Sequence, residues 1–363
     1  MKYLNSKNIL PGDFHNFGKY VFQANDKTIY KPRNIFWEWI FLDSKSPLRK
    51  LFSQDLKYKN RDLFESFPDL KFYSDDFYNS GFVEILKFDS LLELNDNINI
   101  QIGSFAAIMA WFGIGDLHFD NLAIGYEYKN QKQIFCPLDI ETIFEDISLL
   151  NEIALIPPII QNNSKFGFHE LVTLYKKINP EKYLSIILKN FVDIIRFLDE
   201  NENKILNIFY GIELFYQSKI RIIPRSTNDY KIALEKKGEL MDPSIYLSEQ
   251  TQLFRNDIPY YFRFISSRDI FHFNSPTNFI LSDISQDIEK FKISKLRVFE
   301  NSNLSRPLNR DLLFKSGLLQ IVRYFTSDLD FFNICDNGIE IIKKINEIKI
   351  NYKGEFKIKC EIY

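Results

Sequence analysis

Hydrophobic positions near the start of the chain alternate in two short runs that predict a β-hairpin. Tyr20–Gln23 and Thr28–Tyr30 are rich in β-branched and aromatic residues, and the Asn-Asp pair between them is typical of a turn. Lys31 follows the second run, immediately before a proline. The next segment, Ile35–Phe41, is apolar at helical as well as continuous spacing, which predicts a short helix.

A longer apolar segment in the middle of the chain, Ile102–Phe112, has the composition of a buried helix. Two short β-prone runs, Leu122–Ile124 and Ile134–Cys136, come after it and are separated by a polar turn over Lys129–Lys132. This pattern predicts a second hairpin. The glycine-containing polar residues between the helix and the hairpin are therefore expected to form a loop.

Beyond residue 141 the hydrophobic positions repeat at helical intervals, with two β-prone interruptions. The segments expected to be helical are His169–Lys177, Tyr183–Leu198, Lys204–Phe215 and Leu312–Phe332, and the two expected strands are Ile220–Ile223 and Pro259–Ile265. The residues at the C-terminus are interpreted as a short polar tail. We therefore expect an α+β protein that is mostly helical in its C-terminal part.

Composition narrows the class of protein. The chain has 363 residues, a net charge of −2 and 26% charged residues, so no global charge attracts nucleic acid or an anionic membrane. Its 36 phenylalanines indicate a large packed core. Residues 1–11 lack the apolar core of a signal peptide, and no run approaches the roughly 20 apolar residues of a membrane span.

The cysteines argue against a disulfide framework and against a zinc site. Cys136, Cys335 and Cys360 are odd in number and far apart, and none belongs to a cluster with zinc-ligand spacing. We interpret them as reduced residues that serve mostly in packing. Together with the missing targeting segment, this predicts a cytoplasmic location.

The stretch richest in candidate catalytic and metal-binding residues is Gly115–Asn121. It contains Asp116, His118 and Asn121, and a second acidic pair, Asp139 and Glu141, follows the predicted hairpin. Phosphoryl transfer requires a group that orients the attacking hydroxyl and oxygen ligands for Mg²⁺, and this stretch offers both. Taken singly, Asp and Asn are ordinary turn residues and a lone His is more often structural.

The order of the polar residues strengthens the functional interpretation. A lysine on an early strand, Lys31, precedes the loop, and the acidic pair follows it, which is the order of phosphate-binding lysine, catalytic loop and metal-binding acid in kinases. The chain has no GxGxxG loop to cover the phosphates, so an atypical kinase fold is expected. The alternative for Lys31 is a solvated lysine at a strand end.

Six ordered motifs resemble those of the dehydratase domain of class II lanthipeptide synthetases, and Ser267-Arg268-Asp269 follows the last of them. The motifs are Gly12-Asp13-x-His15-x-x-Gly18, Ile29–Arg33, Gly115–Asn121, Leu138–Thr142, Arg221-x-x-x-Arg225-x-Thr227-x-x-Tyr230 and Asn256–Tyr260. The resemblance covers roughly residues 12–270.

The resemblance implies a two-lobed, atypical protein- or lipid-kinase-like fold of α+β class. A small β-rich N-terminal lobe would occupy residues 1–110. A larger, mostly helical C-terminal lobe, residues 111–363, would carry the catalytic loop, the metal-binding acids and an elimination element. The implied reaction uses ATP and Mg²⁺ to phosphorylate Ser or Thr of a peptide, and the same site then expels phosphate to leave a dehydroamino acid.

The resemblance also implies roles for individual residues. Lys31 would hold nucleotide phosphates and assist the later proton removal, and Asp116 with His118 beside it would orient or deprotonate the hydroxyl. Mg²⁺ and the nucleotide would be held by Asn121, Asp139 and Glu141. Elimination would depend on Arg221 and Thr227, since Arg grips phosphate in a bidentate manner.

Some assignments keep an alternative. Asp13 and His15 match active-site positions of the family, yet turn and capping roles fit them about equally. Arg221 and especially Arg225 also fit outward-facing positions on an edge strand. Asp257 is interpreted as part of a turn that supports the fold, and His169 and His272 as surface or packing residues.

The chain departs from the family at both ends. Full-length class II synthetases carry a long segment before the first motif and a zinc-dependent cyclase domain afterwards, so ring closure is not expected here. A separate cyclase or leader-binding protein is a candidate partner beside the peptide or protein substrate. Two alternatives stay open: a minimal kinase that stops at the phosphorylated protein, peptide or small molecule, and a catalytically inactive kinase-like binding module.

Overall fold

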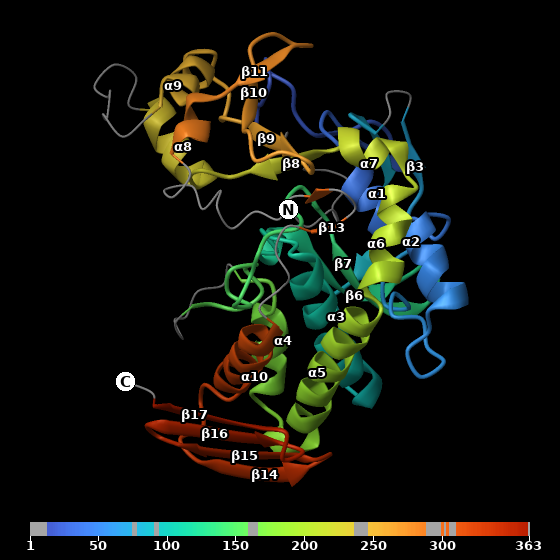
Figure 1. Cartoon of the computed structure of the whole chain (residues 1–363), viewed down its shortest axis with the longest axis vertical. Coiled ribbons are helices and arrows are strands. Elements are labelled where there is room, and N and C mark those ends of the chain that lie inside the picture. Colours follow the sequence, from blue (N-terminus) through green and yellow to red (C-terminus); the bar gives the residue numbers. More distant parts are fainter. Residues whose placement is uncertain are drawn as a thin grey trace.

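The structure is a computed structural model that describes residues 13–74, 78–90, 94–158, 166–235, 246–287, 299–300, 303–304 and 310–361. It has a mixed α/β architecture with several antiparallel sheets (Figure 1). The predicted α+β class is confirmed at this level. Residue 12, which opens the first motif, lies outside the described part, as do residues 1–11.

The N-terminal part forms a four-stranded antiparallel sheet with the order β1-β2-β4-β3. Its strands are β1 (Phe22–Gln23), β2 (Thr28–Lys31), β3 (Phe72–Tyr73) and β4 (Gly81–Glu84). The helical elements α1 (Phe36–Leu42), α2 (Pro47–Lys50) and the π-helix η1 (Leu51–Asp55) lie between β2 and β3. The first predicted hairpin is confirmed, because Phe22 pairs with Tyr30, and so is the predicted short helix.

The middle of the molecule is built around one buried helix, α3 (Asp96–Phe112). Asn95 caps its N-terminus by accepting the N–H of Ile98, and Gly113 ends it in a left-handed conformation with φ of 62°. A three-stranded sheet of β5 (Phe88–Asp89), β6 (Leu122–Glu127) and β7 (Lys132–Pro137) follows, with the short 3-10 helix η2 (Phe119–Asn121) before β6. The second predicted hairpin and the loop before it are therefore confirmed.

The helices after residue 141 are mostly where the sequence placed them. The helical elements are α4 (His169–Tyr175), η3 (Pro180–Lys182), α5 (Leu184–Glu200), α6 (Glu202–Tyr210), α7 (Glu213–Gln217), α8 (Thr227–Glu235), α9 (Leu247–Phe254), η4 (Asp283–Gln286) and α10 (Arg310–Phe325). The single helix expected over Lys204–Phe215 is two helices, since the chain breaks at Gly211 and Ile212.

A second four-stranded sheet lies at the opposite end of the molecule from the C-terminus (Figure 1). Its order is β11-β10-β9-β8, and its strands are β8 (Lys219–Ile222), β9 (Tyr261–Phe264), β10 (Phe271–Phe273) and β11 (Phe279–Leu281). Both predicted strands are present as β8 and β9, and they pair with each other. The two-residue strands β12 (Phe299–Glu300) and β13 (Asn303–Leu304) pair separately.

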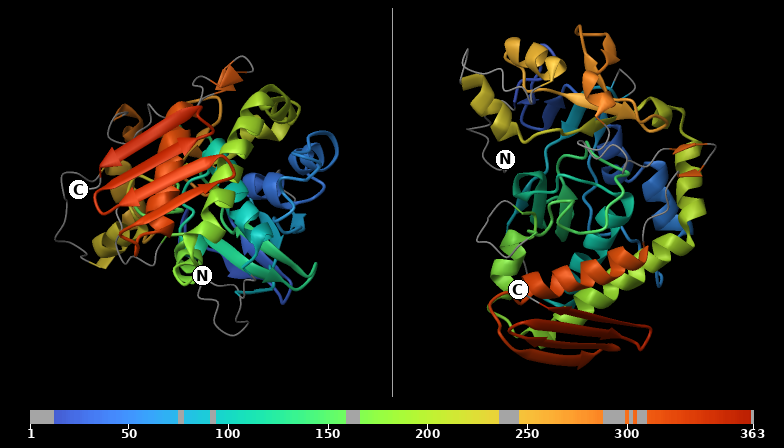
Figure 2. Two further views of the ribbon diagram at one scale, coloured as in Figure 1. Left: turned by 90° about the horizontal axis from the view of Figure 1, so that it is seen from below. Right: turned by 60° about the vertical axis from the view of Figure 1, so that its left-hand side comes forward.

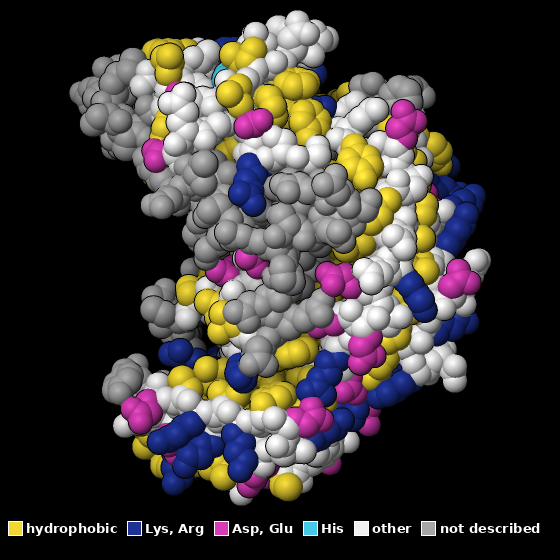
Figure 3. All heavy atoms as spheres, viewed as in Figure 1, with side chains coloured by type: hydrophobic (Ala, Val, Ile, Leu, Met, Phe, Trp, Pro, Cys, Tyr) yellow, Lys and Arg dark blue, Asp and Glu magenta, His cyan; other side chains and the backbone are white. Residues whose placement is uncertain are grey.

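The C-terminal segment corrects two predictions. Helix α10 ends at Phe325, and the expected polar tail is an antiparallel meander of β14 (Phe332–Asp336), β15 (Ile339–Lys344), β16 (Glu347–Tyr352) and β17 (Phe356–Glu361). Isoleucines on one face of this sheet are buried, while charged residues of both signs cover the other face (Figure 3). Figure 2 shows α10 and α5 lying over the sheet.

A single hydrophobic core runs through most of these elements, from Ile35 to Tyr352. The boundary expected between residues 110 and 111 falls inside α3, so the two-lobed division stays a prediction. The part expected to be mostly helical also contains the hairpin β6-β7 and the sheets β8–β11 and β14–β17. None of the described helices is long and apolar enough to cross a membrane.

Candidate functional site

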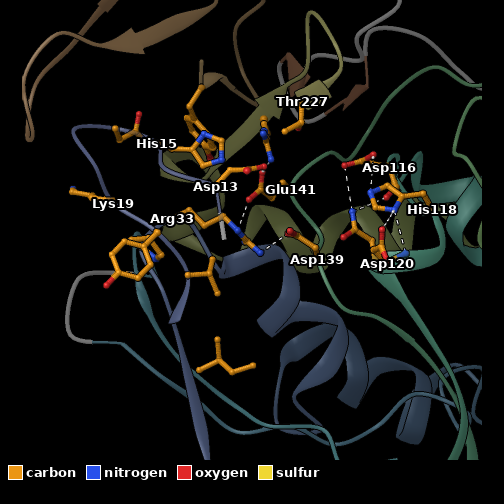
Figure 4. A pocket seen from close by; sticks show the side chains of 18 of the residues that line it. Asp13, His15, Lys19, Arg33, Asp116, His118, Asp120, Asp139, Glu141 and Thr227 are labelled. Atoms are coloured by element: carbon orange, nitrogen blue, oxygen red, sulfur yellow. Dashed lines mark hydrogen bonds and ion pairs between the residues drawn. The ribbon is translucent and has the colours of Figure 1, made fainter. Parts of the chain in front are cut away.

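The polar residues singled out in the sequence meet in one cavity of about 410 Å³. Six separate parts of the chain supply its walls: the segment before β1, β2 with the residues that follow it, the loop between α3 and β6, the segment after β7, β8 with α8, and the residue before β9 (Figure 4). Nine predicted site residues line it, namely Asp13, His15, Asp116, His118, Asn121, Asp139, Glu141, Arg221 and Thr227.

Lys31, the tenth predicted residue, lies behind the cavity wall. Its Nζ donates to Glu38 Oε1 (2.8 Å) and to the carbonyl of Leu138 (2.7 Å), and its side chain is buried. Glu38 belongs to α1, so this ion pair ties the second strand to the first helix. A lysine on a strand paired with a glutamate on a helix is the arrangement that active kinases use to hold phosphates.

Arg33 is the electrostatic centre of the site. Its guanidinium contacts three carboxylates: Glu38 at 2.6 Å, and Asp139 and Glu141 by still shorter contacts. Burial opposes the positive charge, yet the three carboxylates together raise the pKa of Arg33 well above its ordinary value. Only a planar guanidinium offers enough fixed donors to join three acids at once.

Glu141 lies between two arginines. Its second carboxylate oxygen accepts from Arg221 Nη1 at 2.6 Å, and its backbone carbonyl accepts the N–H of Arg221 at 2.8 Å. Burial alone would raise the pKa of Glu141, but Arg221 and Arg33 lower it to about 2. Because arginines engage both of its oxygens, the role that the geometry describes for Glu141 is to hold them in place. Its assignment as a metal ligand stays a prediction.

Arg221 is held from a second side by an aromatic ring. Its guanidinium carbon lies 5.3 Å from the ring centre of Tyr260, which is a cation–π distance. Strand pairing explains this geometry, because Arg221 on β8 is opposite Phe262 on β9 and Tyr260 precedes that strand. The side chain therefore stays charged and oriented toward the cavity that it lines.

The loop after α3 presents Asp116 in an unusual conformation. Asp116 has φ of 58°, a left-handed value that is uncommon outside glycine and often found at functional sites. Asn121 Nδ2 stabilises it by donating to its backbone carbonyl (2.9 Å) and more weakly to its Oδ2 (3.3 Å). Burial raises the pKa of Asp116, against the opposing effect of His118 and Arg221.

His118 lies beside that aspartate, with Nε2 3.8 Å from Asp116 Oδ1. Its Nδ1 accepts the backbone N–H of Asp120 at 3.2 Å, so Nδ1 is the lone-pair nitrogen and Nε2 carries the proton toward Asp116. His118 and Asp116 thus lie side by side at the cavity edge (Figure 4), at a distance too long for a direct hydrogen bond.

Asn121 and Asp139 are brought together by the second hairpin. Leu122 pairs with Pro137, and the N–H of Leu138 donates to the carbonyl of Asn121 at 2.8 Å. Amide and carboxylate oxygens at adjacent strand ends fit Mg²⁺, which is usually held by one or two carboxylates together with substrate phosphates. Among the described residues, no group of three His, Cys, Asp or Glu side chains is placed to hold a metal ion by itself.

Asp139 differs electrostatically from Glu141. Burial raises the pKa of Asp139 to about 7, although Arg33 opposes the shift. Its side chain is 30% exposed toward the cavity, whereas that of Glu141 is 8% exposed. Of the two acids, Asp139 is therefore the accessible one.

His15 has a defined tautomer. Its Nδ1 lies 2.7 Å from the carbonyl of Ile258, and because a carbonyl only accepts, Nδ1 carries the proton and Nε2 the lone pair. Burial and then the charge of Arg221 lower the pKa of His15. A neutral imidazole with its lone pair on Nε2 therefore lines the cavity, near enough to Arg221 to respond to its charge. Asp13, on the same segment, pairs with Lys231 of α8 at 2.9 Å.

The sequence analysis missed four contributors: Arg33, Glu38, Tyr260 and Lys231. Arg33 and Tyr260 stood inside motifs quoted for the resemblance, so their position beside Lys31 and Asn256–Pro259 was the available signal. Glu38 sits in a continuous apolar helix, where a single buried acid is itself unusual. Arg225, for which an outward position was considered, pairs with the buried Glu249 outside the cavity.

A scan against protein-family models finds no family that matches this chain. A search of curated proteins likewise finds no match. The function is therefore argued from the chemistry of the cavity.

Proposed function

We propose that this protein is an ATP-dependent phosphotransferase that phosphorylates Ser or Thr of a peptide and then eliminates the phosphate. The observation that carries the proposal is the convergence of an orienting acid, two oxygen ligands and two fixed arginines on one cavity. An atypical kinase-like fold is part of the proposal. The ion pair between Lys31 and Glu38 supports it, since this pair is a recurring part of kinase sites.

In the first step, residues of the loop after α3 prepare the hydroxyl. Asp116 accepts the hydroxyl proton or orients the oxygen for attack, with His118 beside it and Asn121 donating to its backbone carbonyl. Asn121 and Asp139 would hold Mg²⁺, which neutralises phosphate charge when it is bound. Arg33, which lines the cavity, supplies fixed positive charge close to the transferred group, and Lys31 adds positive charge from behind the cavity wall.

The lining of the cavity gives the nucleotide an orientation. Tyr20, Val21, Ile29 and Pro32 form an apolar stretch of wall beside the charged residues. A nucleobase packs against apolar and aromatic side chains, while its phosphates need cations. We therefore place the base against this wall and the phosphates toward Arg33.

In the second step, the opposite side of the cavity removes phosphate. His15 Nε2 takes the Cα proton of the phosphorylated residue, the electron pair forms the Cα–Cβ double bond, and the Cβ–O bond breaks with phosphate as the leaving group. Arg221 grips the departing oxygens. Thr227, the first residue of α8, places its hydroxyl and the positive end of the helix dipole near them.

The test is incubation of the protein with ATP, Mg²⁺ and Ser- or Thr-containing peptides, followed by mass spectrometry. Loss of one water per modified residue supports the proposed dehydratase. A stable gain of phosphate supports the minimal kinase instead. If neither product forms and no nucleotide binds in calorimetry, both enzymatic proposals fail and the binding module stands.

A further inference from the structure

The loop that carries Asp13 and His15 has an unfavourable backbone conformation. Asn16, Phe17 and Gly18 have φ angles of 48°, 67° and 76°, so three consecutive residues lie in the left-handed region. Glycine adopts this conformation freely, but for Phe17 the Cβ atom crowds the backbone. Such a loop keeps its shape only where neighbouring groups hold it.

A buried aspartate from a distant segment holds this loop. Asp257 is fully buried, and its two carboxylate oxygens accept the N–H groups of Phe17 at 2.8 Å and Gly18 at 2.9 Å. Arg255 compensates the charge through Nε at 3.1 Å, and its guanidinium lies 3.9 Å from the ring centre of Phe17. The carboxylate is therefore satisfied by the loop and by one arginine.

The next residue, Ile258, fixes the other side of the loop. Its N–H donates to the carbonyl of Phe14 at 2.7 Å, and its carbonyl accepts from His15 Nδ1 at 2.7 Å. Residues 257 and 258 thus make hydrogen bonds on both sides of His15. This is more than the fold-supporting turn expected for Asp257 from the sequence.

We propose that Asp257 is a positioning residue: it holds the left-handed loop at residues 16–18, so that His15 keeps its Nδ1–H tautomer and presents Nε2 to the cavity. The kinetic part of this proposal rests on the proposed function, because it assigns His15 to elimination. The structural part does not depend on any activity.

The structural part is tested by amide hydrogen exchange and histidine NMR on Asp257→Asn in the full chain. The asparagine NH₂ group replaces one acceptor, so the amides of Phe17 and Gly18 should exchange at least about tenfold faster. The chain has four histidines, so His15 can be assigned with a His15→Gln variant, and its Nδ1–H signature should weaken. Asp283→Asn is the control, because the hydrogen bonds described for its side chain come from Ser248, Ser282 and Ile284 and not from residues 14–18.

A second variant avoids removal of a buried charge. A Cβ on Gly18 would meet no atom within 4 Å, so Gly18→Ala penalises only the left-handed backbone. In this variant the amides at positions 17 and 18 should also exchange faster, although Asp257 is unchanged. Unchanged exchange of residues 14–18 in both variants, relative to Asp283→Asn, would overturn the positioning role.

The kinetic part compares the two chemical steps. With ATP and Mg²⁺, Asp257→Asn should phosphorylate peptide at a rate within about threefold of the unmodified protein. Elimination from the phosphorylated peptide should fall at least about tenfold in rate constant with little change in KM. Equal slowing of both steps would contradict the assignment. If the unmodified protein modifies no peptide, the proposed function fails, while the exchange and NMR results still decide the positioning role.

Discussion

At the scale of single residues, the site is organised by arginines that join acids. Arg33 connects Glu38, Asp139 and Glu141, and Arg221 shares the last of these. The motifs in the sequence predicted nine of the nineteen residues that line the cavity. They did not predict the central role of Arg33, because two of its three acidic partners, Asp139 and Glu141, lie more than a hundred positions away in the sequence, and no local spacing encodes such contacts.

Replacement of Arg33 should therefore be costly for stability as well as for activity. Arg33→Ala leaves three carboxylates in a buried site without their common partner, and we expect a loss of about 3–5 kcal/mol in the free energy of unfolding. Arg33→Lys keeps the charge but not the fork of donors and should recover only part of this. Urea unfolding measures both. Arg268→Ala, at an exposed position outside the cavity, is the control. If Arg33→Ala lowers the free energy of unfolding no more than this control does, Arg33 does not organise the site.

At the scale of elements, two features support the site: the close packing of α3 against α5, and the hydrogen bonds that Asp193 accepts from surrounding side chains. Helix α3 delivers the chain to Asp116, and α5 packs along it. The sequence predicted α3, α5 and both hairpins from their periodicity. It also contained a signal for the C-terminal meander, since Asn337-Gly338 between alternating isoleucines is typical of a hairpin. The interpretation as a polar tail gave too much weight to the lysines on its solvent face.

The contact between α3 and α5 depends on a glycine. A Cβ at Gly103 would lie 2.3 Å from the carbonyl oxygen of Ile187 and 3.0 Å from the nitrogen of Phe191. Gly103→Ala should therefore push the helices apart and destabilise the protein by about 1–3 kcal/mol. At Gly211 the nearest atom to such a Cβ is 3.7 Å away, so Gly211→Ala should be nearly neutral. Thermal unfolding compares the two, and equal effects would show that the contact is not glycine-dependent.

Asp193 on α5 joins three parts of the chain. It accepts hydrogen bonds from Lys189, from Tyr58 and from Tyr352 of β16. Burial opposes its ionisation, but these hydrogen bonds hold the pKa of Asp193 well below its ordinary value.

The pH dependence of stability follows from this lowered pKa. Because the folded-state pKa lies below the unfolded value of about 3.9, the stabilisation is complete above that value, declines below it, and is lost as the pH falls through the folded-state pKa. Asp193→Asn should lower the free energy of unfolding at pH 7 by about 1–3 kcal/mol and flatten its decline below pH 4. The matched control is Asp55→Asn at an exposed position. An unchanged acid limb in urea titrations would contradict the role of Asp193.

At the scale of the whole molecule, one core joins the region of the cavity to the C-terminal sheet. Ile341, Ile350 and Tyr352 belong to the same buried cluster as the aromatic residues around α1 and α3. Which sheets form, and in what strand order, could not be predicted, because pairing such as β8 with β9 joins segments separated by some forty residues and two helices. The convergence of the motifs on one cavity is likewise a property of the tertiary structure.

A shared core predicts that the C-terminal sheet unfolds together with the rest. Ile341 is fully buried, so Ile341→Ala should lower stability by about 2–5 kcal/mol. All three tryptophans, Trp37, Trp39 and Trp111, lie far from it in the sequence. In Ile341→Ala, the urea midpoint followed by tryptophan fluorescence and the midpoint followed by far-UV circular dichroism should fall by the same amount. A shift in circular dichroism alone would show that the sheet is a separate cooperative unit.

The central claim is that one cavity both makes and removes a phosphate ester. The most direct measurement is mass spectrometry of a Ser- or Thr-containing peptide after incubation with ATP, Mg²⁺ and either Arg221→Ala or Asp139→Ala. Phosphorylated peptide should accumulate with Arg221→Ala, since elimination slows roughly 10²-fold, whereas Asp139→Ala should give no phosphorylation. If Arg221→Ala blocks phosphorylation as severely as Asp139→Ala, the two steps do not divide between these residues and the claim is wrong.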